Sequence, residues 1–483
     1  MLKPYRSIIF VLIIAPFYLA AQNGLTDEKN KVIQSLESEQ AQWSETAQKI
    51  WNYAELGYQE TKSSALLIEH LAGAGFKVDE AVAGMPTAFV ASYGEGHPVI
   101  GILAEFDALP GVSQEAVPYR KERKDCASGH ACGHHLFGTG STAAAIAVKK
   151  WLQQNNITGT IRLYGTPAEE GGSGKVYMVR EGLFDDVDAV LHWHPGSSNN
   201  ASAASCLAIK SALFKFHGVS AHAAGAPWRG RSALDGVEAM NDMINLMREH
   251  VPDMTRIHYV ITSGGEAPNV VPEYAEVNYY VRHPEMKVVH EIFERMVKAA
   301  EGAALGTGTS LDYEVTGGSY NLLPNETLAQ EMYKNLEQIG GVKYDDAELA
   351  FARELIKSYP ETDVDLGAAA NVGPFIVTDQ AYPYSTDVGD VSWIVPTTGL
   401  GAATWVPGTG AHSWQAVAAG GTTIGKKGMM VAAKTIACTA IDLFRNPSIV
   451  EKAKIELAER QGKSFKYEAL IGDGPPNLNY RDK

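Results

Sequence analysis

The sequence predicts an α/β protein of two domains, in which a smaller ferredoxin-like α+β domain is inserted into a larger α/β domain. Three observations lead to this prediction. The 483 residues are 45% hydrophobic and 20% charged, which is enough apolar material for more than one core. Predicted strands alternate with predicted helices up to residue 206. Between residues 207 and 319 the order of elements changes, and helices typical of the first region return afterwards.

The larger domain is expected to comprise residues 25–206 and 320–460. Apolar residues at helical spacing and short apolar runs predict helices at 28–56 and 141–152, the latter starting near Gly138, and strands at 88–93, 99–104, 160–164 and 189–193. After the insertion we expect helices at 326–339 and 427–444, followed by a charged, peripheral tail after Asn446. This alternation favours a sheet covered by helices on both faces.

The inserted domain is expected at residues 207–319. Its pattern predicts, in order, a strand at 207–218, a helix at 232–250, strands at 256–263 and 275–281, a helix at 285–304 and a strand at 310–316. This β-α-β-β-α-β series is the split unit of ferredoxin-like domains. Glycine-rich joins near Ser205 and at Gly317 and Gly318 suit hinges on either side of it.

The N-terminus has the pattern of a signal peptide at residues 1–21. Lys3 and Arg6 precede an apolar run at 8–19, which the small residues Ala20 and Ala21 follow. The run is well short of the roughly 20 residues that a membrane-spanning helix needs, although an uncleaved anchor is the alternative. We therefore expect a secreted or periplasmic protein that is free of the membrane after cleavage.

The charge excludes some partners. Asp and Glu outnumber Lys and Arg by 56 to 41, and the net charge is -15. Such a surface repels phosphate backbones and anionic lipid, so nucleic acid is not an expected partner.

The segment 128–135, Ser-Gly-His-Ala-Cys-Gly-His-His, contains the densest set of metal-binding side chains. Thiolate and imidazole are good ligands for zinc-like ions, and Cys132 and His134 can converge on one ion if the glycines allow a sharp turn. Each histidine taken alone could instead be a buried, hydrogen-bonded ring. Four cysteines in a chain of this length do not form a disulfide framework.

Two carboxylates, Glu169 and Glu170, follow a predicted strand and precede two glycines. Adjacent side chains on an extended segment point in different directions, so one carboxylate can bind a metal while the other faces the substrate. This division suits metal-assisted hydrolysis, in which an attacking water needs both a Lewis acid and a general base. A Glu-Glu pair by itself is more often a solvated loop.

Further candidate ligands are histidines. His192 and His194 lie on the same side of a predicted strand, so either could reach a metal while the other lies behind it. His412 lies in a glycine-rich loop before a predicted helix, where a single histidine is more often a surface residue.

Between Trp51 and Trp414 the sequence resembles the metal-dependent amidohydrolases related to aminoacylase, hippurate hydrolase, auxin-conjugate hydrolase and carboxypeptidase G. It is most similar to the branch that contains the B-subunit of p-aminobenzoyl-glutamate hydrolase. The resemblance is carried by FDALP at 106–110, GHACGH at 129–134, PAEEGG at 167–172, WHP at 193–195, GVSAHA at 218–223, GGEAPNVVP at 264–272 and STDVGDVSW at 385–393.

The resemblance implies a zinc-peptidase-like catalytic domain that holds two divalent ions, Zn²⁺, Mn²⁺ or Co²⁺. Cys132 would bridge the two ions, and His134 and His194 would complete the first. Glu170 and His412 would complete the second.

The same resemblance assigns roles around the ions. Glu169 would be the general base. Asp107 would not bind an ion itself but would orient a residue that does. The inserted domain would act as a lid and dimerisation domain. On it, His222 would polarise the scissile carbonyl, in many members from the partner chain, and Asn269 would contact substrate.

Two positions depart from the common pattern. Hippurate-type relatives have an L-H-x-W-P pattern, which selects His192 as the strand ligand, whereas the W-H-P pattern of the more similar branch selects His194. His194 is favoured, and His192 is the alternative. His135 stands where such proteins usually have Asn or Asp, and filling space is the favoured interpretation over a spare ligand.

The expected function is hydrolysis of the amide bond in a small N-acyl or N-aroyl amino acid such as p-aminobenzoyl-glutamate. A homodimer or a pair with a related subunit is the expected assembly. Three alternatives stay open: a dipeptidase for unusual dipeptides, a non-catalytic metal- or solute-binding protein, and an enzyme with Cys126 or Cys132 as nucleophile. A retained Glu169 disfavours the binding protein, and a cysteine nucleophile would need a paired base and no metal.

Overall fold

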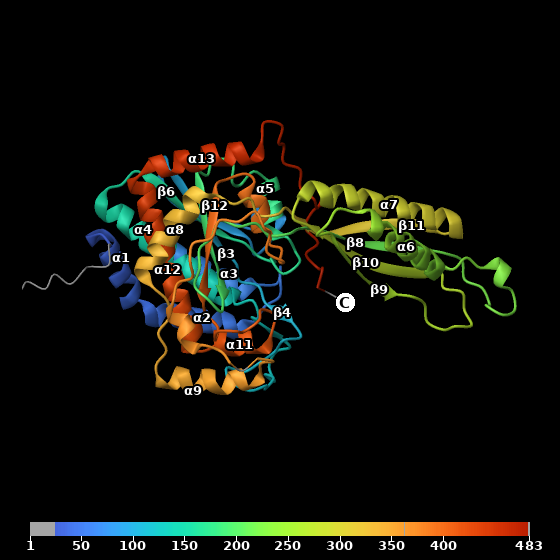
Figure 1. Cartoon of the computed structure of the whole chain (residues 1–483), viewed down its shortest axis with the longest axis horizontal. Coiled ribbons are helices and arrows are strands. Elements are labelled where there is room, and N and C mark those ends of the chain that lie inside the picture. The colour runs from blue at the N-terminus through green and yellow to red at the C-terminus, as the bar shows by residue number, and fades with distance from the viewer. Residues whose placement is uncertain (1–24, 362, 482–483) are drawn as a thin grey trace, which may run out of the picture.

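The computed structural model describes residues 25–361 and 363–481, so the expected signal peptide at 1–21 lies outside the described residues. The chain forms a larger α/β part, from which a smaller α+β part extends as an arm (Figure 1). The predicted α/β class is confirmed. Within the two described ranges, no helix combines the length and apolarity required to cross a membrane.

The larger part is built on a six-stranded sheet. Its strands are, in spatial order, β1 (Lys77–Glu80), β2 (Phe89–Glu95), β6 (Gly159–Gly165), β3 (Val99–Ala104), β7 (Ala189–Gly196) and β12 (Thr397–Ala403). The strands from β6 to β12 run parallel, and β2 pairs antiparallel with both β1 and β6. The carboxyl ends of the parallel strands therefore meet at one edge, which is where α/β sheets bind ligands.

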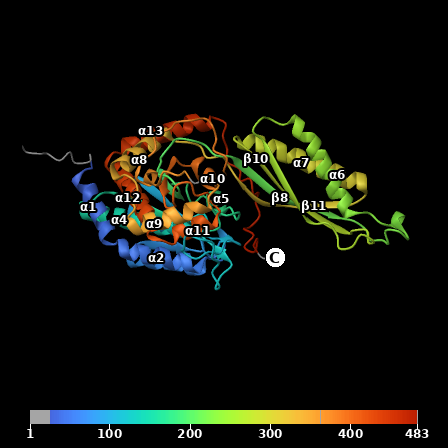
Figure 2. The same ribbon diagram turned by 60° about the horizontal axis from the view of Figure 1, so that its bottom comes forward.

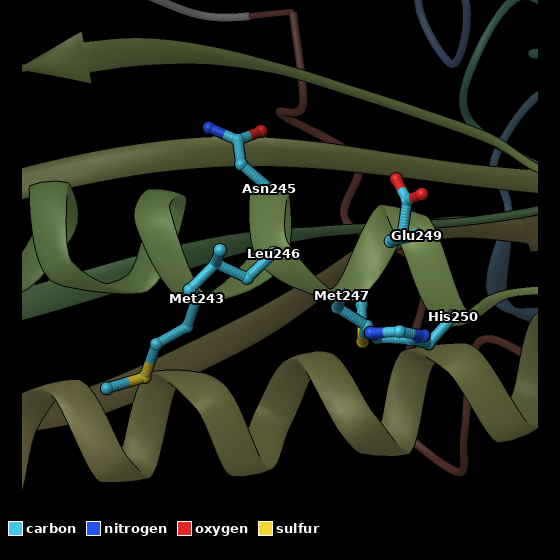
Figure 3. A pocket seen from close by; sticks show the side chains of 6 residues that line it. All are labelled: Met243, Asn245, Leu246, Met247, Glu249 and His250. Carbon is cyan, nitrogen blue, oxygen red and sulfur yellow. The ribbon is translucent and has the colours of Figure 1, made fainter.

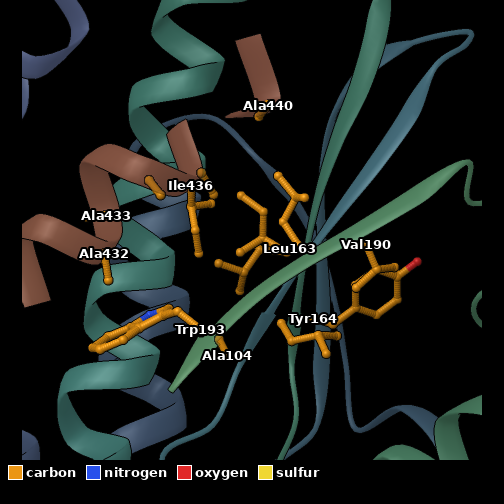
Figure 4. Packing of buried hydrophobic residues seen from close by; sticks show 14 of the residues in the cluster. Ala104, Leu163, Tyr164, Val190, Trp193, Ala432, Ala433, Ile436 and Ala440 are labelled. Atoms are coloured by element: carbon orange, nitrogen blue, oxygen red, sulfur yellow. The ribbon is translucent and has the colours of Figure 1, made fainter. Parts of the chain in front are cut away.

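Two long helices, α4 (His134–Asn155) and α12 (Thr423–Arg445), pack together against this sheet (Figure 4). Trp193 of β7 and Ile436 of α12 are fully buried between these layers. Gly140 permits the close approach of α4, because a Cβ there would lie 3.0 Å from both Trp193 and Met429. The other helices of this part are α1 (Asp27–Ser38), α2 (Gln40–Tyr53), α3 (Thr61–Gly73), α5 (Gly174–Arg180), α8 (Glu326–Ile339), α9 (Asp346–Leu355), α10 (Val388–Ser392), α11 (Trp414–Gly420) and α13 (Pro447–Gln461), and β4 (Leu109–Pro110) pairs with β5 (Ser128–Gly129).

The arm has its own sheet and its own core. Its elements are β8 (Ala208–His217), α6 (Ala233–Met247), β9 (Arg256–Ser263), β10 (Tyr274–His283), α7 (Met286–Thr307) and β11 (Ser310–Ser319). The strands are antiparallel in the order β11-β8-β10-β9, and α6 and α7 cover one face (Figure 2). Phe214 and Tyr279 on the strands and Met240 and Ile292 on the helices are buried between them.

One surface feature of the arm lies along α6. Met243 and Leu246 are 41% and 74% exposed, beside a shallow depression of about 470 Å³ that His250 also lines (Figure 3). The depression is distant in sequence from every predicted metal ligand.

Two predicted features are wrong. The single helix expected at 28–56 is two helices that separate at Glu39, whose φ of -98° and ψ of 2° are not helical. Both helices pack on α4 and α12, with Val32 and Leu36 of α1 and Trp43 and Ile50 of α2 buried. The tail after Asn446 is not peripheral. It forms α13, which packs on α8, and then a segment that returns to the junction between the two parts (Figure 1).

Candidate metal centre

The candidate site lies at the carboxyl edge of the parallel strands. Asp107 follows β3, Glu169 and Glu170 follow β6, His194 lies near the end of β7, and His412 lies in the loop after β12. Cys132 and His134 reach the same edge because α4 begins there. Gly133 between them has a φ of 80°, a left-handed conformation that favours glycine, and a Cβ there would lie 2.6 Å from Pro195. The sharp turn required for convergence is therefore present.

The first group of potential ligands is formed by Cys132, His134 and His194, whose ligand atoms lie within 4.8 Å of one another. Asp107 Oδ1 lies 2.8 Å from Nδ1 of His134, and the carbonyl of Pro195 lies 2.7 Å from Nδ1 of His194. Because each Nδ1 is occupied by an acceptor, the Nε2 atoms are the ones available to a metal. Nε2 of His194 lies 3.3 Å from Sγ of Cys132.

The second group is formed by Cys132, Glu170 and His412, again within 4.8 Å. His412 has a φ of 59°, and its backbone N–H donates to the carbonyl of Ala131 at 2.9 Å. This conformation brings its Nε2 to 3.3 Å from Oε1 of Glu170. Cys132 belongs to both groups, so the two positions share one thiol.

The chemistry of these groups fits divalent metal ions. Nε2 of His134 and Oε1 of Glu170 are buried and make no hydrogen bond within the described part of the chain, although Glu105 Oε2 lies 3.1 Å from the first atom and His412 Nε2 lies 3.3 Å from the second. Buried polar atoms without a hydrogen bond are uncommon, and a bound metal ion would satisfy both of these atoms. Sulfur, imidazole and carboxylate donors together suit zinc-like ions.

The other histidines lie outside these groups among the described residues. The ring of His192 packs against Gly399 of β12, where a Cβ would lie 2.4 Å from it, and burial lowers the pKa of His192 to about 4. His135 contacts other residues than His134 does, with its Nε2 3.1 Å from the carbonyl of Gly420 and its ring against His130. His135 therefore occupies space behind the site.

Glu169 lies beside the metal groups. One of its oxygens is within 4.8 Å of ligand atoms of both His134 and Glu105. Burial raises the pKa of Glu169 well above its usual value, and the charges of Glu105, Glu170 and Asp387 add to the increase. Burial opposes the charged form of His134, but Cys132, Glu105 and Asp107 outweigh it and raise the pKa of that imidazole.

Sequence reasoning missed a buried ionic network directly behind the site. Lys175 Nζ lies 2.7 Å from Glu105 Oε1 and 2.6 Å from Asp387 Oδ1, and Glu105 Oε2 lies 3.1 Å from Nε2 of His134. The lysine side chain has no exposed surface. Glu105 and Asp387 lie beside or within recognised motifs, which could have indicated them, whereas Lys175 has no comparable sequence signal.

His222 and Asn269 are brought together, but not at this edge. Val270 forms a bridge with His222, and the amide of Ala223 donates to the carbonyl of Asn269 at 3.0 Å. The loop 218–231 follows the outer end of β8, away from the larger part (Figure 1). The amides of Ala224 and Gly225 both donate to Nδ1 of His222, which places the ring proton on Nε2.

The comparisons with known proteins agree with the resemblance seen in the sequence. A profile of the peptidase family M20/M25/M40 matches residues 101–354. The chain is 41% identical to the B-subunit of p-aminobenzoyl-glutamate hydrolase from Escherichia coli (strain K12), over 87% of this chain and 93% of that protein. It is 29% identical to Xaa-Arg dipeptidase of Mus musculus, over 84% of this chain and 86% of that protein.

A solved structure has a similar fold. The aminobenzoyl-glutamate utilization protein of Klebsiella pneumoniae superposes with a TM-score of 0.59 at 18% identity, covering 86% of this chain and 98% of that one. The predicted hydrolase class is confirmed with the family. The chain belongs to the peptidase family M20/M25/M40.

Proposed function

We propose that this chain hydrolyses the amide bond of a small N-aroyl or N-acyl amino acid, with p-aminobenzoyl-glutamate as the first candidate substrate. The observation that carries the proposal is the thiol of Cys132, shared by two groups of potential ligands with Glu169 beside them. The substrate is suggested by the relative from Escherichia coli, which is 41% identical over nearly its whole length.

The proposed cofactor is a pair of divalent ions, Zn²⁺, Co²⁺ or Mn²⁺. Cys132, His134 and His194 would hold one ion, and Cys132, Glu170 and His412 the other. When bound, such ions polarise a carbonyl and lower the pKa of water. Asp107 supports both positions, because it accepts from the backbone amide of Glu170 at 2.9 Å while its other oxygen contacts His134.

Glu169 is the proposed general base. It takes a proton from the attacking water and delivers that proton to the nitrogen of the leaving amine. Glu169 and Glu170 leave one short loop after Ala168, but their carboxylates reach different neighbours. Glu169 lies with Glu105 and His134, whereas Glu170 lies with Cys132 and His412. His222, with its proton on Nε2, is the proposed donor to the carbonyl oxygen as negative charge develops there.

The proposed assembly is a homodimer or a pair with a related subunit. His222 lies on the loop at the outer end of the arm, so a partner chain is the simplest source of this donor. The A-subunit of p-aminobenzoyl-glutamate hydrolase from Escherichia coli is also similar, at 28% identity over 53% of this chain and 61% of that protein. We also propose a secreted or periplasmic location, on the strength of the signal pattern at residues 1–21.

The second candidate function is a dipeptidase, which the Xaa-Arg dipeptidase relative favours. The cysteine-nucleophile alternative has less support. Burial raises the pKa of the Cys132 thiol, which opposes a free thiolate, and the thiol of Cys126 donates to the carbonyl of Ser128 at 3.3 Å rather than to a base.

The test is a hydrolysis assay on protein that has been stripped of metal and reloaded with Zn²⁺, Co²⁺ or Mn²⁺. We expect release of p-aminobenzoate from p-aminobenzoyl-glutamate, no activity in the stripped protein, and little turnover of dipeptides with a C-terminal arginine. Preferred cleavage of the dipeptides would select the second candidate function. Full activity in the presence of chelators would instead revive the cysteine nucleophile.

The matched variant is Glu169→Gln, which keeps the size of the side chain and removes the base. A loss in kcat of roughly 10²-fold or more is expected, with both ions retained. A near-normal rate, or a protein without ions, would contradict the assignment of Glu169.

A further inference from the structure

The segment 462–481, which we call the C-terminal strap, returns from α13 to the candidate metal centre. In both views it leaves the end of α13 and descends through the junction between the larger part and the arm (Figures 1 and 2). Its last described residues, Tyr480 and Arg481, reach the backbone of Glu170. The strap and the metal centre are distant in sequence, because 311 positions separate Glu170 from Arg481.

The strap is anchored along its length on both sides of the junction. Tyr467 donates to Asp390 Oδ1 at 2.7 Å, and Leu470 is buried against Gly318. Arg180 of α5 donates to two carbonyls of the strap, those of Gly472 at 2.9 Å and Gly474 at 2.7 Å. Asn477 donates to Glu314 Oε1 of β11 at 3.1 Å. The course of the strap is therefore fixed by several independent contacts.

The end of the strap fits a site that glycine makes possible. The ring of Tyr480 packs edge-on against Tyr58, with ring centroids 5.6 Å apart. A Cβ on Gly57 would lie 2.2 Å from the hydroxyl of Tyr480, so only glycine accommodates this ring position. That hydroxyl lies 3.4 Å from the carbonyl oxygen of Glu170, and the guanidinium of Arg481 donates to the same oxygen.

The loop that receives these contacts has little regular structure to hold it. Ala168 and Ser173 at its two ends have φ values of 57° and 58°, which are unfavourable for residues other than glycine. Side chains from elsewhere compensate. Glu60 Oε1 accepts from the amide of Ala168 at 2.9 Å, and Tyr58 donates to the carbonyl of Gly172 at 2.6 Å.

Glu170 lies at the centre of this loop, and both its backbone amide and its backbone carbonyl make hydrogen bonds. Its amide donates to Asp107 at 2.9 Å, and its carbonyl accepts from the strap. Without the strap, the peptide after Glu170 would lose the Tyr480 and Arg481 side chains that contact its carbonyl. A shift of the backbone at Glu170 would move the carboxylate that lies 3.3 Å from His412.

We propose that Tyr480 and Arg481 are positioning residues that hold Glu170 in the geometry needed for the second metal position. The proposal rests on the proposed function, because it requires Glu170 to be a ligand of that metal. It assigns no contact with substrate to the strap.

The test measures stepwise binding of Co²⁺ and Zn²⁺ to metal-stripped full-length protein, by competition with a chromophoric chelator and by the Co²⁺ absorption spectrum. In the double variant Tyr480→Ala/Arg481→Ala we expect the second ion to bind roughly 10- to 100-fold more weakly, the range for lost partners behind a metal ligand. The first ion, at Cys132 and His194, should bind as in wild type. The single variant Arg481→Lys keeps a cationic donor group, so it should bind the second ion more tightly than the double variant does.

Asn477→Ala is the matched control, because it removes a strap contact to the arm and leaves Glu170 untouched. It should bind both ions as wild type does. Hydrogen exchange of the amides of 166–174 gives a second measurement in the folded double variant, where we expect faster exchange than in the control. Unchanged binding of both ions would overturn the proposal, and so would equal weakening of both, since that indicates a purely structural tail.

Glu170→Ala separates this proposal from the proposed function. If Glu170→Ala loses one ion while the double variant binds both normally, only the strap proposal fails. If Glu170→Ala itself binds both ions normally, the assignment of Glu170 as a ligand is wrong, and the strap proposal falls with it.

Discussion

The buried lysine behind the metal centre leads to a prediction about stability. Lys175→Met replaces an ammonium between Glu105 and Asp387 with an apolar side chain of similar length. Both carboxylates are nearly inaccessible, with side-chain exposures of 1% and 3%, so water cannot replace the lost partner. At an effective dielectric constant near 20, each contact represents about 6 kcal/mol of attraction, most of which offsets desolvation. The expected net loss is about 3–5 kcal/mol, the cost of leaving a buried charge unpaired.

Lys29→Met provides the matched control for this loss. Lys29 is also buried, at 9% side-chain exposure, and contacts Asn335 at 2.8 Å and Asp442 at 2.6 Å. Asp442 is 21% exposed, so water can partly solvate it after the substitution. The free energy of unfolding in urea should therefore fall less for Lys29→Met than for Lys175→Met, with all proteins stripped of metal.

A second substitution tests whether the loss in Lys175→Met comes from the unpaired carboxylates. Adding Asp387→Asn to Lys175→Met removes one of the unpaired charges and should recover part of the lost stability, a coupling that only interacting residues show. The explanation would be refuted if Lys175→Met stayed within about 0.5 kcal/mol of wild type, as surface substitutions do. It would also be refuted if Asp387→Asn lowered the free energy of unfolding of Lys175→Met by as much as it lowers that of the wild type.

Three further predictions follow from other parts of the molecule. Cys132→Ser replaces the shared thiol with a poor ligand, so we expect depletion of both ions in metal analysis; full occupancy would make Cys132 an ordinary buried residue. His222→Ala should keep both ions and lose roughly 10²-fold or more in kcat. Mixing it with inactive Glu169→Ala should restore partial activity if the donor comes from a partner chain, and no recovery despite subunit exchange would place the donor in its own chain. Burial raises the pKa of Asp390 to about 7, so the folded state keeps this proton where the unfolded state has lost it. Stability from this group therefore falls as pH rises from about 4 to about 7, by roughly 4 kcal/mol in total, and urea unfolding across that range should show a flatter profile for Asp390→Asn.

The sequence was sufficient where function depends on short local patterns. Cys132 and His134 are two positions apart, Glu169 and Glu170 are adjacent, and each pair follows or precedes a recognisable element. Because parallel strands place their carboxyl ends at one edge, these local patterns come together without any further information.

The sequence was not sufficient where a partner is distant and has no pattern of its own. Lys175 belongs to a short helix whose composition gives no sign of two carboxylates at positions 105 and 387. Tyr480 also has no sequence signal, because its ring fits only where Gly57 has no side chain. The break at Glu39 was missed because α1 and α2 both keep helical spacing, and a glutamate gives no sign of the non-helical backbone found there.

The arm places His222 far from the metal centre of its own chain, which fits the proposed role of this residue in the site of a partner. β8 starts at the junction beside the metal centre and runs outward for 10 residues, or about 33 Å at 3.3 Å per residue. The loop that follows it carries His222, and Asn269 lies beside it in the loop between β9 and β10. Two backbone amides already fix the histidine as an Nε2–H donor. A rigid arm that ends in an oriented donor is well suited to a site on another chain, because β8 pairs along its length with both β10 and β11 and cannot fold back without breaking those ladders. The same rigidity makes the proposed composite site dependent on how two chains pair.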